Sequence, residues 1–153
     1  MRILLVAAVA LVDPDGRVLI GKRPEGKMLA GLWEFPGGKV EAGERPEAAL
    51  IRELKELGLR FALDDFGAGM CSFAYLKHLP VDYVKIDGAF VRDMFAEPMN
   101  LEVVSAINNI AHSLGMKTIA EFVETEGALN KLREMGVDYA QGFAIERPQP
   151  LAA

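Results

Sequence analysis

The strongest constraint on the fold is a regular alternation of strand and helix patterns that begins after Arg60. Apolar runs predict strands at 61–64, 82–86, 117–121 and 138–144. Helical patterns predict helices at 71–78, 101–114 and 126–135, with a helical turn around 90–94. Strands that alternate with helices form parallel sheets with right-handed crossovers. The sequence therefore predicts an α/β fold for this part of the chain.

A second constraint is the amphipathic segment at 46–58, which reads PEAALIRELKELG. Leu50, Ile51, Leu54 and Leu57 recur at three- and four-residue spacing, so they form one apolar stripe on a helix. A proline opens the segment and Gly58 closes it, which is the usual asymmetry of helix ends. We expect one helix of about three turns here.

The residues before this helix have strand character. Strands at 3–12 and 17–22 flank an Asp-Pro-Asp-Gly turn, so a β-hairpin is predicted. The first strand follows Arg2 and superficially resembles a signal peptide, but the turn after it favours a strand. Residues 32–36 are expected to be extended because they end in a proline. Gly37 and Gly38 then predict a tight turn with close backbone approach.

Composition limits the number of domains, the partners and the cellular compartment that we expect for the protein. The 153 residues are 51% hydrophobic, which is ample for one domain and short for two. A net charge of -5 argues against a nucleic-acid duplex as partner, and no run is long enough to span a membrane. Cys71 is the single cysteine, so we expect a reducing, cytoplasmic setting. His78 and His112 have no carboxylate beside them in sequence and are expected in ordinary surface or boundary roles.

One spaced pattern runs from the glycines into the helix. Gly38, Glu44, Arg52, Glu53 and Glu56 lie in the register of the Nudix signature, so the first part of the chain resembles a Nudix hydrolase. The resemblance implies that Glu53 and Glu56 hold Mg²⁺ against a diphosphate, that Glu53 is catalytic, and that Gly38 lies at the substrate. The alternative is a solvated helix face.

The Nudix pattern then breaks. The signature has two adjacent glutamates, but Glu56 is followed by Leu57, and Gly58 arrives one residue early. The missing glutamate is a principal metal ligand in the family, so its loss removes a full negative charge from the site. The strands that would complete a Nudix domain are also missing.

Five ordered motifs follow the helix. They resemble the carboxy-terminal portion of an EAL domain, the TIM-barrel phosphodiesterase that hydrolyses cyclic di-GMP. The motifs are DDFGAG at 64–69, LPVD at 79–82, KID at 85–87, AEFVE at 120–124 and QGF at 141–143. The resemblance implies a half TIM barrel of about four parallel strands with intervening helices.

The EAL resemblance also implies roles for particular residues. Asp64, Asp65 and Glu121 would bind metal, Lys85 would be catalytic by positioning water, and Gln141 would line the substrate pocket. The alternatives are carboxylates that cap a helix and a Lys85–Glu121 salt bridge without chemistry. The Glu-Ala-Leu tripeptide that names the family is absent from the sequence, as are the metal-binding Asn and Glu that follow it in the family.

Together these patterns predict a chimera. Residues 1–58 form a Nudix-like half-domain that ends in a shared helix, residues 50–153 form an EAL-like half-barrel, and we expect both to pack as one domain. The first hypothesis is a recombined or engineered scaffold without efficient catalysis. The alternatives are a weakened Nudix-type pyrophosphohydrolase and a remnant that binds cyclic di-GMP or a divalent metal. No cofactor is required under the first, and Mg²⁺ or Mn²⁺ would bind under the others.

A half-barrel leaves two open sheet edges and an open inner face. The N-terminal strands could cover one edge, or a second chain could cover the rest. High hydrophobic content without a membrane segment favours association, so a homodimer is expected. A nucleotide ligand is disfavoured because both sites are incomplete.

Overall fold

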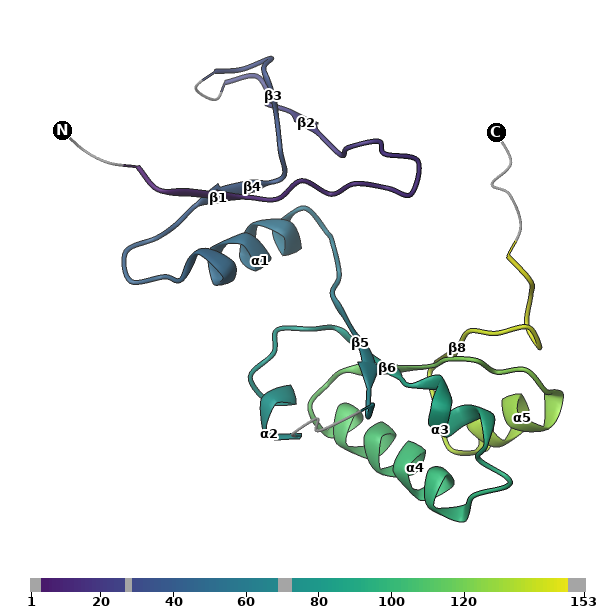
Figure 1. Ribbon diagram of the computed structural model, residues 1–153. Helices are drawn as coiled ribbons and strands as arrows, with labels where there is room; N and C mark the ends of the chain where they lie inside the picture. The colour runs from purple at the N-terminus through teal and green to yellow at the C-terminus, as the bar shows by residue number, and fades with distance from the viewer. Residues whose placement is uncertain (1–3, 27–28, 69–72, 149–153) are drawn as a thin grey trace. The chain divides into compact units, whose positions relative to one another are not determined.

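A computed structural model describes residues 4–26, 29–68 and 73–148. The chain divides into two compact units, Met1–Arg60 and Phe61–Ala153, and each is described by itself (Figure 1). Outside the described residues lie residue 3 of the first predicted strand, Gly69 of the DDFGAG motif, and Cys71 and residue 72 at the start of a predicted helix. The packing of both half-domains as one domain stays a prediction.

The N-terminal unit contains two short antiparallel pairs instead of the predicted hairpin. β1 (Val6–Ala8) pairs with β4 (Gly37–Lys39), and β2 (Gly21–Lys22) pairs with β3 (Trp33–Glu34). Only an isolated bridge between Val12 and Val18 joins the two predicted hairpin strands. The hairpin prediction was wrong beyond the turn, because β1 pairs with β4 and β2 pairs with β3.

The predicted tight turn at Gly37 and Gly38 is also wrong, because both glycines lie in β4. The expected close approach is present. A Cβ atom on Gly37 would collide with the backbone of Ala7, and one on Gly38 would collide with the carboxylate of Glu53. Glycine is therefore needed at both positions so that the strand can approach its partner strand and the helix.

The predicted helix is α1 (Pro46–Glu56), which confirms the amphipathic pattern. Ala49 and Leu54 are buried in it. Leu57 does not belong to the buried stripe, since it caps the helix and is 66% exposed. Gly58 follows with φ of 83°, the left-handed conformation that commonly ends helices.

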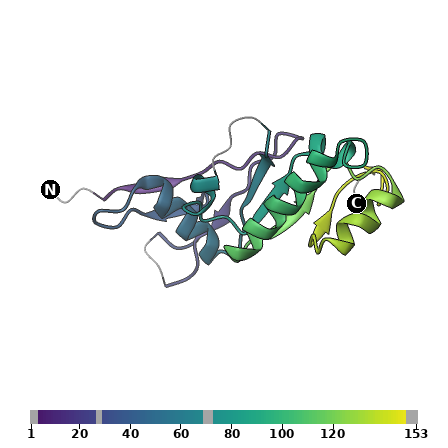
Figure 2. The ribbon, with the colours of Figure 1, turned by 90° about the horizontal axis from the view of Figure 1, so that it is seen from below.

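The C-terminal unit is a four-stranded parallel sheet in the order β5-β6-β7-β8, which confirms the predicted α/β fold. Figures 1 and 2 show α4 lying along one face of this sheet. The strands are β5 (Ala62–Phe66), β6 (Tyr83–Ile86), β7 (Lys117–Ala120) and β8 (Tyr139–Ala140). The helices are α2 (Phe73–Leu76), α3 (Gly88–Arg92), α4 (Pro98–Ser113) and α5 (Glu126–Glu134). β8 is shorter than the predicted strand because the chain turns after Ala140.

The core of this unit lies between the sheet and its helices. Val84 and Ile86 of β6 are fully buried, as are Val104 and Ile107 of α4. Burial of such side chains stabilises the fold by roughly 1.5–3 kcal/mol each. The alternate residues of the strand, Tyr83 and Lys85, point to the opposite face of the sheet and are half-buried.

A polar network joins the amino ends of β7 and β8 to α4. Thr118 bonds to Asn108 of α4, and its backbone N–H donates to the Asp138 carboxylate. His112 Nε2 lies 2.7 Å from Asp138 Oδ2, so this histidine has a carboxylate partner that its sequence neighbours did not reveal. Burial raises the pKa of the Asp138 carboxyl, but hydrogen bonds from Thr118 and His112 outweigh burial and hold the pKa below its usual value.

We expect Asp138→Asn to lower the free energy of unfolding at pH 7 by about 1–2 kcal/mol, the cost of weakening buried hydrogen bonds. A lowered carboxyl pKa contributes stability above the unfolded value of about 3.9. That contribution is lost as the pH falls through the folded pKa. Urea unfolding followed by circular dichroism should therefore show the variant and the parent converging below about pH 4. Glu134→Gln, at an exposed surface pair, is the control. A difference that does not shrink at low pH would contradict this account.

Candidate metal centre

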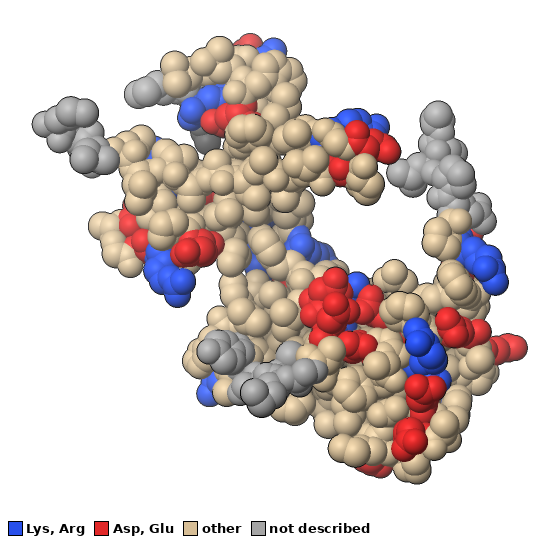
Figure 3. Space-filling model, in the orientation of Figure 1, with Lys and Arg blue, Asp and Glu red and all other residues tan. Residues whose placement is uncertain are grey.

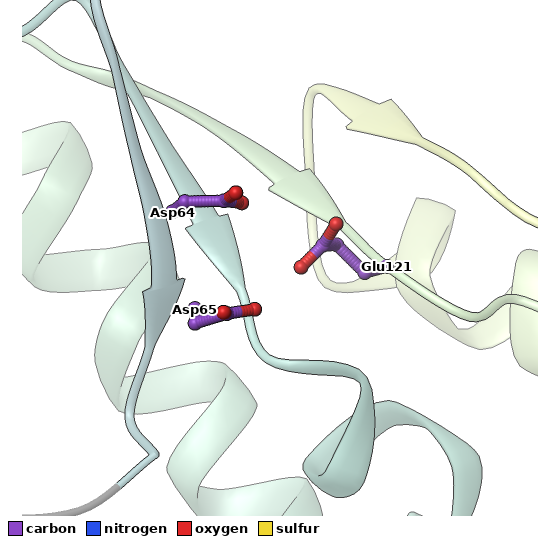
Figure 4. A group of neighbouring side chains, drawn as sticks. All are labelled: Asp64, Asp65 and Glu121. Carbon is purple, nitrogen blue, oxygen red and sulfur yellow. The ribbon is translucent and has the colours of Figure 1, made fainter. Parts of the chain in front are cut away.

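Asp64 and Asp65 come to the carboxyl end of β5 through an irregularity in the strand. The pairing of β5 with β6 shifts register between Leu63 and Phe66, and Asp65 has φ of 48°. Adjacent residues of a regular strand point to opposite faces. The left-handed conformation at Asp65 interrupts that alternation, and both carboxylates turn toward Glu121 (Figure 4). Non-glycine residues held in this conformation are costly and gather at functional sites.

Glu121 reaches the same place from the carboxyl end of β7. Its backbone N–H donates to the carbonyl of Ile86, and the residue is only 7% exposed. The next residue, Phe122, has φ of 52°. Its ring packs on Gly88, where a Cβ atom would collide with it, and the Arg92 guanidinium lies 4.9 Å from the ring centre. A second strained residue thus fixes the direction of the buried carboxylate.

The three carboxylates form one cluster. Asp64, Asp65 and Glu121 each offer an oxygen, and these oxygens lie within 4.8 Å of one another. The Lys85 ammonium lies 2.5 Å from Asp64 Oδ1 and 2.6 Å from Glu121 Oε1. The predicted Lys85–Glu121 pair is therefore present. Acidic surface gathers over this unit in the space-filling view (Figure 3).

The electrostatics follow from these contacts. Burial lowers the pKa of the Lys85 ammonium, but hydrogen bonds to Asp64 and Glu121 outweigh burial and raise the pKa above its usual value. The hydrogen bond from Lys85 in turn holds the pKa of the Asp64 carboxyl below its usual value. Lys85 thus remains charged at neutral pH and acts as the counter-ion of the cluster.

The donor set fits a hard divalent cation. Magnesium and manganese prefer carboxylate oxygen, and three carboxylates at one strand edge supply it. Lys85 already contacts two of these carboxylates, so a cation has to share them with the ammonium or displace it. The roles of Asp64, Asp65 and Glu121 as ligands stay a prediction.

Gln141 lies beside the cluster, at the end of β8. Its backbone N–H donates to the carbonyl of Ala120. With Glu121 it lines a pocket of about 140 Å³, whose other lining residues are Phe122, Glu124, Gly142 and Phe143. The sequence patterns predict no site role for these four residues. Glu124 and Phe143 stand inside the quoted motifs, which is a usable signal, whereas the backbone conformation of Phe122 has no signature in sequence.

The predicted Nudix-type residues are held by an arginine. Arg52 lies 2.8 Å from Glu53, 3.1 Å from Glu44 and 3.5 Å from Glu56. Hydrogen bonds to Glu44 and then Glu53 raise the pKa of the Arg52 guanidinium. The bond from Arg52 lowers the pKa of the Glu44 carboxyl. Among the described residues, the strand-end cluster is the one group of three metal-ligating side chains that the geometry brings together. Metal binding by Glu53 and Glu56 stays a prediction.

The fold and the cluster define an α/β protein whose acidic residues lie where barrel enzymes build their sites, at the carboxyl ends of parallel strands. The model of the EAL domain matches residues 34–148, and the chain belongs to that family. The model of the NUDIX domain matches residues 1–65, which overlaps the first match across α1. No helix of the described residues has the length and apolar character needed to cross a membrane.

Curated relatives are similar to about two thirds of the chain. Cyclic di-GMP phosphodiesterase PdeB of Shewanella oneidensis is 48% identical over 104 residues, covering 68% of this chain and 12% of that protein. Probable cyclic di-GMP phosphodiesterase PdeA of Escherichia coli is 42% identical over 102 residues, covering 67% of this chain and 14% of that protein. The chain thus spans about an eighth to a seventh of the length of these relatives.

Solved structures agree with the family. An EAL domain protein from Listeria monocytogenes is 42% identical with a TM-score of 0.61, and the match covers 66% of this chain and 41% of that one. The FimX EAL domain of Pseudomonas aeruginosa, bound to c-di-GMP, is 33% identical with a TM-score of 0.60, covering 65% of this chain and 41% of that one. The likeness therefore extends over less than half of an EAL structure.

Replacing the counter-ion tests the electrostatics of the cluster. We expect Lys85→Met to lower the free energy of unfolding by about 1–3 kcal/mol in EDTA, because buried Glu121 loses its cationic partner. Added Mg²⁺ should restore part of this loss, since a cation can replace the ammonium. Denaturant unfolding with and without Mg²⁺ measures both effects.

The matched control is Lys131→Met, which breaks an exposed lysine pair on α5. Such surface pairs contribute about 0–1 kcal/mol, and no recovery with Mg²⁺ is expected. Equal losses in the two variants, or no effect of Mg²⁺ on Lys85→Met, would contradict the proposed electrostatics.

Proposed function

We propose that the protein is a recombined chain of two half-domains whose EAL-like unit binds a divalent cation and cyclic di-GMP without efficient catalysis. The observation that supports this most is the cluster of Asp64, Asp65 and Glu121 around Lys85. Three carboxylates at the strand ends of an EAL family member have the position and the chemistry of a cation-binding site, which supports the proposal.

The residues have distinct tasks under this proposal. Asp64, Asp65 and Glu121 hold Mg²⁺ or Mn²⁺, which supplies neutralising charge to a phosphodiester and acidifies bound water. Lys85 gives a second positive charge at the same place and stays protonated because its pKa is raised. Gln141 lines the adjoining pocket together with the Phe122 and Phe143 side chains, which offer apolar surface to a base.

The names and the bound ligand of the relatives support the proposed ligand class. PdeB and PdeA are named as cyclic di-GMP phosphodiesterases, and the FimX domain was solved with c-di-GMP bound. The EAL domain match covers residues 34–148, which include the three carboxylates of the cluster. A cyclic dinucleotide has two phosphodiesters, so a cation beside a cationic lysine suits it.

Binding without efficient turnover follows from what surrounds the cluster. The carboxylates come from two strands of a four-stranded sheet, whereas a complete barrel builds its site from several of eight strands. The Glu-Ala-Leu tripeptide is absent from the sequence. Two-metal hydrolysis needs enough ligands to hold both ions against attacking and leaving oxygens. Three carboxylates shared with an ammonium do not provide them.

The shared helix supports the recombined origin. The NUDIX match ends at residue 65 and the EAL match begins at residue 34, so both include α1. A join inside a helix that suits both parents keeps its buried face, which contains Ala49 and Leu54. Local sequence and fold then remain consistent across the junction.

The alternative function is a weakened Nudix-type pyrophosphohydrolase. Its carboxylates, Glu53 and Glu56, share one helix face beside Gly38, as that chemistry needs. Arg52 pairs with both of them and with Glu44, so a cation there would have to displace a guanidinium from each. This arrangement favours the strand-end cluster over the helix as the cation site.

Calorimetry of the full chain with cyclic di-GMP and Mn²⁺ tests the proposal. We expect measurable heat in the parent protein and at least a tenfold weaker affinity in Asp64→Asn and Asp65→Asn, corresponding to about 1.4 kcal/mol or more. Cyclic di-GMP hydrolysis under the same conditions should remain far below the usual enzyme range of about 1–10³ s⁻¹.

The control is Glu102→Gln, which removes an exposed carboxylate from α4 outside the cluster and should leave binding unchanged. No heat in the folded parent protein would end the binding proposal. Turnover within the ordinary range of enzymes would instead reject the claim of inefficient catalysis.

A further inference from the structure

The sheet of the C-terminal unit has an open edge at β8. Gln141 directs both its N–H and its carbonyl toward the β7 side, to Ala120 and Val123. In a parallel ladder the bonding direction alternates with each residue. The N–H and carbonyl of Ala140 therefore point to the other side of β8, where the described part of the chain places no strand.

The sheet edge at β5 also has unpaired backbone groups, on the side of the strand that faces away from β6. The Phe61 carbonyl accepts the N–H groups of Asp82 and Tyr83 on the β6 side. By the same alternation, the backbone groups of Ala62 point away from β6. No strand among the described residues pairs with this side of β5. The unpaired backbone N–H and carbonyl groups of β5 can therefore form hydrogen bonds with those of a β8 strand.

Two tyrosines on the inner face of the sheet correspond to half of one layer of side chains in a barrel interior. Tyr83 of β6 and Tyr139 of β8 meet edge to face with ring centres 5.9 Å apart, although β7 lies between their strands. Barrel interiors are filled by layers of four side chains from alternate strands. The two tyrosines supply two members of such a layer, and Tyr139 remains 45% exposed.

An apolar groove runs along the β8 edge. Its volume is about 500 Å³. It is lined mainly by apolar side chains of α5, β8 and the following turn, among them Leu129, Leu132, Val137, Ala140 and Ile145. A groove of this composition at an unpaired strand edge is a place where another strand docks.

We propose that a second copy of this chain occupies both edges. β8 of each copy pairs with β5 of the other around a two-fold axis, so that two four-stranded sheets close into an eight-stranded parallel barrel. The second copy completes the tyrosine layer with its own Tyr83 and Tyr139. The carboxylate clusters of both copies then share one barrel mouth. This inference does not rest on cation or nucleotide binding.

Exposed apolar side chains supply part of the area that a dimer needs. Three large side chains beside β5 and β8 are 43–51% exposed: Phe73, Tyr139 and Ile145. Covering them in two copies removes roughly 600 Å² from water, taking about 100 Å² for each half-exposed side chain. A standard interface buries about 1,600 Å². The two new strand ladders and the rest of the inner face supply the remainder.

Light scattering of the full chain over a range of concentrations tests the proposal. Buffer with Mg²⁺ limits repulsion between the two carboxylate clusters. We expect the parent mass to be twice 16.7 kDa and to fall toward one chain on dilution. Tyr139→Glu should give a single chain, since a carboxylate beside Lys117 is tolerated at an exposed position but not in a barrel interior.

Ala140→Pro should also give a single chain, because it removes the outward donor of β8. Met99→Glu, a change at a 75% exposed apolar residue on α4, should leave the mass doubled. Circular dichroism checks that each variant is folded. A parent protein of single-chain mass would overturn the proposal. Assemblies without a discrete two-chain species, or variants that remain folded dimers, would do the same.

Discussion

The contact on which the site depends is that of one ammonium with carboxylates from two strands. Lys85 of β6 stands between Asp64 of β5 and Glu121 after β7. Without it, a buried carboxylate would face two others at close range, which costs several kcal/mol in a site of low polarity. A cation bound at this cluster would compete with the ammonium for two of the three carboxylates. The Lys85 ammonium therefore balances part of the negative charge of the cluster.

The backbone around this contact is strained in two places. Asp65 and Phe122 both adopt left-handed conformations; Asp65 belongs to the carboxylate cluster and Phe122 directly follows its member Glu121. Strain of this kind persists only where surrounding packing holds it, as Gly88 and Arg92 hold Phe122. The packing of α3 and α4 on the sheet thus orients the carboxylates, and the site inherits its geometry from the core of Val84, Ile86, Val104 and Ile107.

Much of this could be predicted from the sequence, for definite physical reasons. Apolar runs that alternate with helical patterns predicted the parallel strands, and the spacing of Leu50 and Leu54 predicted α1. Spaced motifs pointed to Asp64, Asp65, Lys85 and Glu121 as one site, and these side chains do lie together. Contacts between residues distant in sequence could not be predicted. β1 pairs with β4 instead of forming the hairpin, and His112 contacts Asp138, which lies 26 residues further along the chain. Leu57 has the right spacing but falls at a helix end, where periodicity no longer decides burial.

Paramagnetic broadening by Mn²⁺ in the amide NMR spectrum of the full chain tests the central claim most directly, because it locates a bound cation without needing turnover. We expect substoichiometric Mn²⁺ to broaden first the signals of Asp64, Asp65, Lys85 and Glu121, and an excess of Mg²⁺ to reverse the effect. Broadening centred on residues 44–56, or spread over the acidic surface without preference, would contradict it.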